Sequence, residues 1–318
     1  MPSEFELIAR HFTRPAPGAR LGVGDDAALL APSAGMELAV STDMLLVGRH
    51  FLPGDDPVKL GHKTLAVNLS DLAAMGARPR WALLALALPE ADEDWLAAFS
   101  RGFFALAGRH GVELVGGDTT RGPLNLCVTL LGEVEAGQAL TRAGARPGDE
   151  IWVSGTLGGA ALGLAHARSE VVLTPAEAAS CLERLHAPEP RVTLGRALQG
   201  VASAAIDVSD GLLADLGHIL ERSGVAAELD FLRLPAPQAV ASRLSDPIVR
   251  RCLLAGGDDY ELCFTAPPDR ADAVVAAGRM AGVAVTRIGR VLAGAGLVLI
   301  GPDAVTVAIT ERGYDHFA

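Results

Sequence analysis

Apolar and polar residues follow two different periods along the chain, and these periods predict alternating strands and helices. Strict alternation in "LNLCVTLLGEV" (124–134) is typical of a half-buried strand. Residues 92–110 instead carry apolar side chains at helical spacing, among them Trp95, Phe99 and Phe103. Because both periods recur along the chain, we expect an α/β or α+β fold in which each element buries one face.

Local start and stop signals predict the bounds of further elements. Asp56-Pro57 combines a capping side chain with proline at a first helical position, and Gly76 suits the end of that helix. The glycine turn in "GVGDDAALL" should enter an apolar strand. Other expected strands are "MELAVSTDM" ending at Asp43, "WALLALALP", "VELVGG", "YELCFT" and three near the C-terminus. Other expected helices span 4–12, 156–168, 174–184, 190–199, 245–254 and 268–281, and "AAIDVSDGLLADLGHILERSG" should form strand, turn and helix.

The amino-acid composition of the sequence changes near Gly137. The Gly/Pro/Arg-rich segment "ALTRAGARPGDEIWVSG" interrupts the regular elements and is typical of a domain junction. A chain of 318 residues is long enough for two domains. We therefore predict an N-terminal domain over 1–138 and a C-terminal α/β domain over 139–318.

Composition and charge argue against several classes of protein. Half of the residues are hydrophobic, so a large core is available, and a net charge of −11 without a basic block argues against sequence-independent nucleic-acid binding. The cysteines form no metal or redox pair at close spacing. The N-terminus lacks the pattern of a signal peptide, and "WALLALALP" is too short to span a bilayer. We expect a reduced, cytoplasmic protein without membrane contact.

Acidic residues recur beside small residues at the expected ends of elements. Asp25-Asp26 follows a glycine pair that does not fit a dinucleotide fingerprint, and no P-loop motif exists in the chain. Asp43 stands with Ser41 and Thr42 where a strand should end. Carboxylate and hydroxyl oxygens are the ligands that Mg²⁺ prefers. For both stretches, a simple turn or cap remains the alternative.

Asp71 is an unusual residue for its position. It falls in the last turns of the helix that ends at Gly76, where a carboxylate opposes the helix dipole at a cost of roughly 0.3–1 kcal/mol. A metal ion or a basic residue such as Lys63 would compensate. Asp118 follows Gly116-Gly117, and exposed backbone N–H groups beside such glycines can face phosphate oxygens.

Asp207 and Asp210 in "DVSDGLLAD" lie between an expected strand and an expected helix. Asp210 alone could cap the helix, but Asp207 sits at a carboxyl strand end, where open α/β sheets bind ligands. If the fold gathers these carboxylates, divalent cations must offset their repulsion. Phosphoryl transfer from ATP uses several Mg²⁺ ions in this way. Arg121 and Arg142 could hold phosphate, although surface arginines are common.

The motifs as a set resemble those of the thiamine-monophosphate kinase family. "GVGDDAALL", "VSTDMLLVGRHF", "NLSDLAAMGARP", "VGGDTTRG", "ALTRAGARPGD", "IDVSDGLLADL", "GGDDYELCFT" and "GYDHF" stand in the order found there, from residue 4 to the last residue. The family belongs to a superfamily of ATP-dependent enzymes that includes aminoimidazole ribonucleotide synthetase. "GGDTT" and "DxSDG" resemble superfamily motifs, whereas the tail resembles the kinase.

This resemblance implies an ATP-dependent phosphorylation of thiamine monophosphate to thiamine diphosphate, by in-line transfer with several Mg²⁺ ions. It implies a two-domain fold like that of the synthetase, with an N-terminal mixed-sheet domain that binds ATP and Mg²⁺ and pairs in a homodimer. The implied Mg²⁺ ligands are Asp26, Ser41, Thr42, Asp43, Asp71, Asp118, Asp207 and Asp210. The implied ATP contacts are Gly117, Asp118, Arg142 and Ser209, and the implied substrate contacts are His50, Asp258 and Tyr314.

No general base is expected, because the second pKa of a phosphate monoester is about 6 and the acceptor is already largely dianionic. Metal ligands and Arg142 would support transfer, and His50 would position substrate unless it only caps a loop. Position 258 is more often glutamate in the family and position 314 often tryptophan, which puts substrate affinity in question. Two alternatives remain open: another ATP-dependent synthetase of the superfamily, and a Mg²⁺–ATP sensor without turnover.

Overall fold

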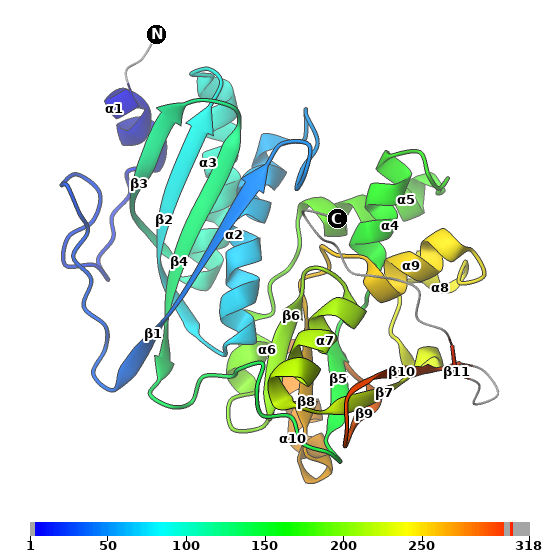
Figure 1. The fold of residues 1–318 in the computed structure, drawn as a ribbon. Coiled ribbons are helices and arrows are strands. Elements are labelled where there is room, and N and C mark those ends of the chain that lie inside the picture. The colour runs from blue at the N-terminus through cyan, green and yellow to red at the C-terminus, as the bar shows by residue number, and fades with distance from the viewer. Residues whose placement is uncertain (1–3, 302–305, 308–318) are drawn as a thin grey trace. The chain divides into compact units, whose positions relative to one another are not determined.

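The chain folds into two compact units, each with its own sheet (Figure 1). The computed structural model describes residues 4–301 and 306–307. One unit comprises the chain up to Leu72 together with Ala77–Gly137, and the other comprises Ala73–Gly76 with the chain from Gln138 onward. The functional roles expected for domains 1–138 and 139–318 stay predictions.

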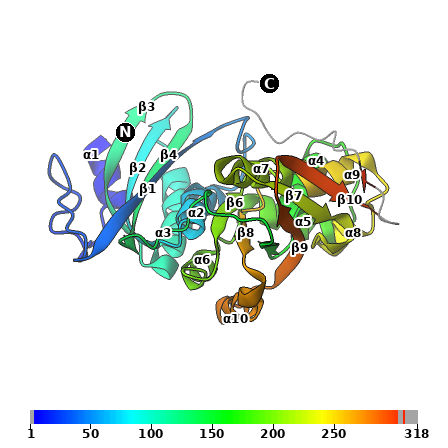
Figure 2. The same ribbon diagram turned by 60° about the horizontal axis from the view of Figure 1, so that its bottom comes forward.

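The first unit is a four-stranded mixed sheet with helices on one face. The strand order is β1-β4-β2-β3, with β2 and β3 parallel and the other pairs antiparallel. Figures 1 and 2 both show α2 and α3 on the same side of this sheet. The elements are α1 (Glu4–Leu7), η1 (Ile8–Phe12), β1 (Met36–Leu46), α2 (Pro57–Ala74), β2 (Arg78–Leu88), α3 (Glu93–His110), β3 (Glu113–Arg121) and β4 (Asn125–Glu135).

The predicted cap at Asp56 is present in the structure, and α3 has a cap at Asp92 that we did not predict. Asp56 accepts the N–H of Val58 at 2.7 Å at the start of α2, and Asp92 accepts the N–H of Trp95 at 3.0 Å at the start of α3. Gly76, just after α2, adopts a φ of 68°, which glycine tolerates without strain. Both predicted helices are therefore confirmed.

Side chains of β1 alternate between the helix-covered face and an open face of the sheet. Ala39 and Leu45 are buried on the helix side, whereas Val40 and Met44 are 59% and 51% exposed on the other side. We call the second side the open face. Its large exposed apolar residues are Met36, Leu38, Val40, Met44, Leu46 and Leu83.

Two strands extend further than the sequence predicted, and one expected strand does not form. β1 continues past Asp43 because β4 pairs with it along its whole length, and β3 continues through Asp118 because β2 pairs with it. "GVGDDAALL" forms bends and isolated bridges such as Leu21↔Leu29 instead of a regular strand. Local sequence does not encode these differences, since strand length depends on a partner strand.

The second unit is a seven-stranded sheet in the order β11-β10-β7-β9-β5-β8-β6, and Figure 2 shows α7 and α10 on opposite sides of its strands. β10 and β7 are parallel and the other neighbours antiparallel. The elements are β5 (Glu150–Ser154), α4 (Gly159–Ala167), α5 (Pro175–His186), α6 (Val192–Ala197), β6 (Ala204–Val208), α7 (Leu212–Ser223), β7 (Ala226–Asp230), η2 (Phe231–Arg233), α8 (Gln238–Ala241), α9 (Pro247–Ala255), β8 (Glu261–Ala266), η3 (Pro268–Arg270), α10 (Ala271–Ala281), β9 (Val285–Leu292), β10 (Gly296–Ile300) and β11 (Thr306–Val307).

The core of the second unit is aliphatic. Val153 of β5, Ile206 of β6, Leu216 of α7 and Leu254 of α9 belong to one cluster of buried side chains. β5, β7 and α8 were not among the predicted elements, whereas the predicted β6–turn–α7 unit is confirmed. Among the described residues, no helix combines the length and the apolar character needed to cross a bilayer.

Candidate functional site

In the first unit, β1 and α2 bring three of the predicted metal ligands to one face of the sheet. Ser41 and Asp43 share the helix-covered face of β1 with buried Ala39 and Leu45. The hydroxyl of Ser41 donates to Oδ2 of Asp71, near the end of α2. Asp71 therefore meets an oxygen-bearing side chain from the strand, and the set offers only hard oxygen ligands, as Mg²⁺ prefers.

Thr42 lies apart from this group. Its Oγ1 is 2.8 Å from Oγ1 of Thr129 on the open face. The period of two along a strand forces this separation, because neighbouring residues point to opposite faces. The structure thus does not bring the side chain of Thr42 together with those of Ser41 and Asp71.

A structural requirement of the sheet explains the glycine before Asp118. Gly117 has a φ of 150°, and a Cβ on it would lie 1.9 Å from the carbonyl oxygen of Leu84. The pairing with β2 shifts beside Val115, which has no partner in the register. Asp118 follows as an exposed strand residue opposite Ala85. The double glycine therefore permits close approach of two strands, which the sequence alone did not reveal.

Asp43 and Gly117 lie in one cross-strand row of the sheet. The row runs from Asp43 to Val128, then to Leu84 and Gly117. With about 4.8 Å between neighbouring strands, these two Cα atoms are about 14 Å apart. Mg–O distances are only about 2.1 Å. Asp118 belongs to the next row, with Ala85, Cys127 and Met44, so its side chain is on the open face, whereas that of Asp43 is on the helix-covered face. Carboxylates at Asp43 and Asp118 consequently need separate ions if both are ligands.

His50 occupies the connection between β1 and α2. Its Nδ1 accepts the N–H of Leu46 at 3.0 Å, which leaves the proton of the neutral ring on Nε2. Its carbonyl oxygen accepts a hydrogen bond from the buried Lys63 at 3.2 Å. The ring therefore caps this loop, as one of our two interpretations expected, and its role toward substrate stays a prediction.

In the second unit, Asp207 lies near the end of β6, and Ser209 and Asp210 lie in the turn between β6 and α7. Asp207 is only 4% exposed, and the other two are half-buried. The N-cap of α7 is Gly211, which has no side chain to cap the helix. Asp215, in the first turn of α7, instead binds the turn that precedes the helix: its Oδ2 accepts the N–H groups of Ser209, Asp210 and Gly211 at 3.1, 3.0 and 3.0 Å. The interpretation of Asp210 as the helix cap is wrong.

Sequence reasoning missed Asp215, although an acidic residue in a first helical turn is a known signal. Asp215 is 3% exposed, and its burial raises the pKa of its carboxyl to about 7 even though backbone N–H groups oppose the shift. The negative charge of Asp210 raises this pKa further.

Asp258 has a strained backbone. Its φ is 67°, and that of Tyr260 is 50°, which is uncommon outside glycine. The hydroxyl of Tyr260 donates to Oδ1 of Asp258 at 3.3 Å. Between them, Asp259 accepts the N–H groups of Gly158 at 2.6 Å and Ala160 at 3.4 Å. Burial raises the pKa of Asp259 to about 7. Asp259 thus anchors the segment in which Asp258 lies.

The remaining predicted residues have fewer described contacts. Asp26 is exposed in the irregular segment before β1. Arg142 is exposed, and its carbonyl oxygen accepts the hydroxyl of Ser223 at 3.2 Å. Tyr314 lies outside the described residues. Among the described residues, no three or more acidic, histidine or cysteine side chains form a group that could hold a metal ion.

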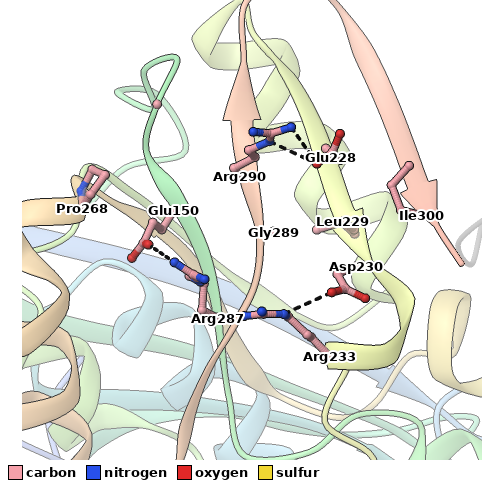
Figure 3. Close-up of a pocket in the computed structure, with 11 residues that line it drawn as sticks. Glu150, Glu228, Leu229, Asp230, Arg233, Pro268, Arg287, Gly289, Arg290 and Ile300 are labelled. Carbon is pink, nitrogen blue, oxygen red and sulfur yellow. Dashed lines mark hydrogen bonds and ion pairs between the residues drawn. The ribbon is translucent and has the colours of Figure 1, made fainter. Parts of the chain in front are cut away.

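A pocket of about 530 Å³ lies elsewhere, on the sheet of the second unit (Figure 3). Its walls carry Arg287 paired with Glu150, Arg290 paired with Glu228, and Arg233 paired with Asp230 at 3.1 Å. The charges of these arginines and carboxylates cancel, and none of the predicted site residues lines the pocket. It gives no ground for assigning a ligand.

Comparisons with known proteins identify the family of the chain. The model of the AIR synthase related protein N-terminal domain matches residues 24–134, and that of the C-terminal domain matches residues 146–301. Thiamine-monophosphate kinase of Salmonella typhimurium is 48% identical over 99% of this chain and 98% of its own length.

Solved structures give the same result. Thiamine-monophosphate kinase from Stenotrophomonas maltophilia has 51% identity and a TM-score of 0.85 over 95% of this chain and 96% of that chain. AaThiL complexed with AMPPCP and TMP has 34% identity and a TM-score of 0.78, over 90% of this chain and 89% of that one. Both domain types and the near-complete coverage confirm the predicted fold class, and the chain belongs to the thiamine-monophosphate kinase family.

Proposed function

We propose that this chain transfers the γ-phosphoryl group of ATP to thiamine monophosphate, giving thiamine diphosphate and ADP. The observation that carries this function is its near full-length likeness to AaThiL, a protein whose structure holds AMPPCP and TMP. Phosphotransfer to a phosphate acceptor requires little covalent help from a protein. It requires that two polyanions approach in line.

The residues of this chain suit that task without a general base. A phosphate monoester has a second pKa of about 6, so the acceptor oxygen carries its own charge at neutral pH. Arg142, an exposed cation, would stabilise charge on the transferred group. Gly117 and Ser209 would contact ATP, and His50, Asp258 and Tyr314 would contact thiamine monophosphate.

Magnesium ions would neutralise the charge that develops on the phosphates. The carboxylates of Asp43 and Asp71 with the hydroxyl of Ser41 would form one binding region, and Asp118 another. The spacing of about 14 Å across the sheet row supports more than one ion. Asp207 and Asp210 would contribute from the second unit, and Asp26 and Thr42 complete the set that the family resemblance implies.

The open face of the first unit supports a homodimer. Monomeric proteins rarely leave large apolar side chains together on one sheet face, and Leu38, Val40 and Met44 are 41%, 59% and 51% exposed. A second copy of this chain would bury them by placing its own open face there. All four cysteines are free, which suits the reducing cytoplasm.

One incubation tests the reaction. The pure protein is incubated with ATP, Mg²⁺ and thiamine monophosphate, and the products are separated by chromatography. We expect thiamine diphosphate and ADP to form together and to disappear when a chelator is added. ATP consumption without thiamine diphosphate would indicate a synthetase of the superfamily, and ATP binding without turnover would indicate a sensor.

A further inference from the structure

One buried carboxylate, that of Asp215, holds the whole β6–α7 turn. Its Oδ2 lies 3.0–3.1 Å from the backbone nitrogens of Ser209, Asp210 and Gly211. Consecutive N–H groups that converge on one oxygen form the type of concavity that binds anions. Here the accepting oxygen is part of the chain, and its residue is 3% exposed.

The opposite edge of the same turn is held through its carbonyl groups. Asp258 donates its N–H to the carbonyl of Ser209, and Tyr260 donates to that of Val208, both at 2.9 Å. Gly257 leaves no room at this contact, since a Cβ there would lie 2.3 Å from the oxygen of Ser209. The turn is thus hydrogen-bonded on both edges, and only the Asp215 side depends on a single side chain.

The turn carries the side chains of Ser209 and Asp210, which are expected to contact Mg²⁺–ATP. Ser209 and Asp210 are half-buried and therefore retain access to solvent, whereas the carboxylate that shapes their backbone is enclosed. Without an acceptor at Asp215, the N–H groups would be left without this partner, and buried N–H groups rarely stay unpaired. The turn would then take another conformation.

We propose that Asp215 is a positioning residue for Mg²⁺–ATP, which fixes the Ser209–Gly211 backbone without touching nucleotide or metal. This inference rests on the proposed function for the identity of the ligand. Displacement of a binding group by about 1 Å can cost on the order of 100-fold in rate. The effect should therefore be large although the residue is enclosed behind the turn.

Two substitutions at this position separate the charge from the hydrogen-bond acceptor. Asp215→Ala removes the acceptor, and we expect kcat/KM for ATP to fall about 100-fold. The KM for thiamine monophosphate should change much less than that for ATP. Asp215→Asn keeps an acceptor oxygen of the same reach but removes the charge, so it should rescue most of the loss. Its affinity for ATP should be about 3- to 10-fold weaker than that of wild type, because a hydrogen bond to a charged acceptor becomes one to a neutral acceptor.

A matched control distinguishes positioning from general weakening. Asp246 caps α9 in the same unit by accepting the N–H of Ile248 at 2.8 Å, away from the turn. Asp246→Ala should lower the unfolding midpoint and leave both KM values unchanged. Hydrogen exchange of the 209–211 amides should accelerate in Asp215→Ala and not in Asp246→Ala.

Direct calorimetric binding of Mg²⁺–ATP keeps this test independent of the reaction. If the wild-type protein binds Mg²⁺–ATP but does not phosphorylate thiamine monophosphate, the proposed function fails while the affinity comparison still decides the role of Asp215. Wild-type affinity in folded Asp215→Ala would overturn the inference. If that variant does not fold, wild-type affinity in Asp215→Asn, with unchanged exchange at 209–211, would overturn it equally.

Discussion

The backbone N–H of Asp258 donates to the carbonyl oxygen of Ser209 at 2.9 Å. This bond joins the residue proposed to contact thiamine monophosphate to the residue proposed to contact ATP. The left-handed φ of 67° at Asp258 is the conformation in which this bond forms. Binding of the two substrates is therefore expected to depend on one hydrogen-bonded unit of the second domain.

Substitution of Gly257 by alanine should disturb this unit. The new Cβ would lie 2.3 Å from the oxygen of Ser209, so one of the two segments must move. We expect a loss of stability of about 1–3 kcal/mol from overpacking and an increased KM for thiamine monophosphate. Steady-state kinetics and urea unfolding measure the two effects.

Gly217→Ala is the control for that substitution. Gly217 lies in α7, and a Cβ there meets nothing within 4 Å, so alanine should stabilise the helix by about 0.5–1 kcal/mol. Kinetic constants for Gly257→Ala that match those of Gly217→Ala would show that the contact between the two segments does not affect substrate binding.

Asp118→Asn should abolish turnover without weakening the fold. Asp118 is exposed, so its substitution should change stability by no more than about 0.5 kcal/mol. Loss of a metal-binding charge should lower kcat by about 100-fold or more. Asp94→Asn, at another exposed position of the first unit, should retain activity. A large decrease in the unfolding midpoint of Asp118→Asn alone would show that the residue is structural.

Local sequence predicted those features that depend on neighbours in the chain. The cap at Asp56 and the stop at Gly76 belong to this class, as does the arrival of Asp207 at a strand end. Features that depend on distant partners were not predictable in this way. Gly117 is required by the carbonyl of Leu84, some thirty residues away in the chain, which no local pattern encodes.

The pH dependence of stability should reveal the buried Asp259. Its pKa is raised from 3.8 to about 7, with burial as the largest cause. Between these values the unfolded chain releases a proton that the folded chain keeps, so stability falls as the pH rises from about 4 to 7. Asp259→Asn lacks this proton. Its urea midpoint relative to wild type should therefore increase over that range, and a constant difference would contradict the assignment.

The pKa of Glu177 is shifted in the opposite direction, so its effect on the pH dependence of stability has the opposite sign. A hydrogen bond from Arg243 is the largest cause that lowers the pKa of Glu177 to about 2. Its contribution is complete above the ordinary value of 4.5 and is lost as the pH falls toward 2. Glu177→Gln should accordingly lower the urea midpoint above pH 5 and approach wild type in acid, a pH window that lies mostly below that of Asp259.

A charge on the open face should separate the proposed homodimer. Val40 is 59% exposed at the middle of β1, and burying a carboxylate there against a second copy would leave it unpaired. We expect Val40→Glu to elute as a folded monomer in size-exclusion chromatography with light scattering, where wild type is a dimer. Val172→Glu, at an 87% exposed position of the second unit, should stay dimeric. A wild-type monomer would exclude pairing through this face. A dimeric Val40→Glu would exclude it as well, because a carboxylate cannot replace the apolar contact that Val40 would make.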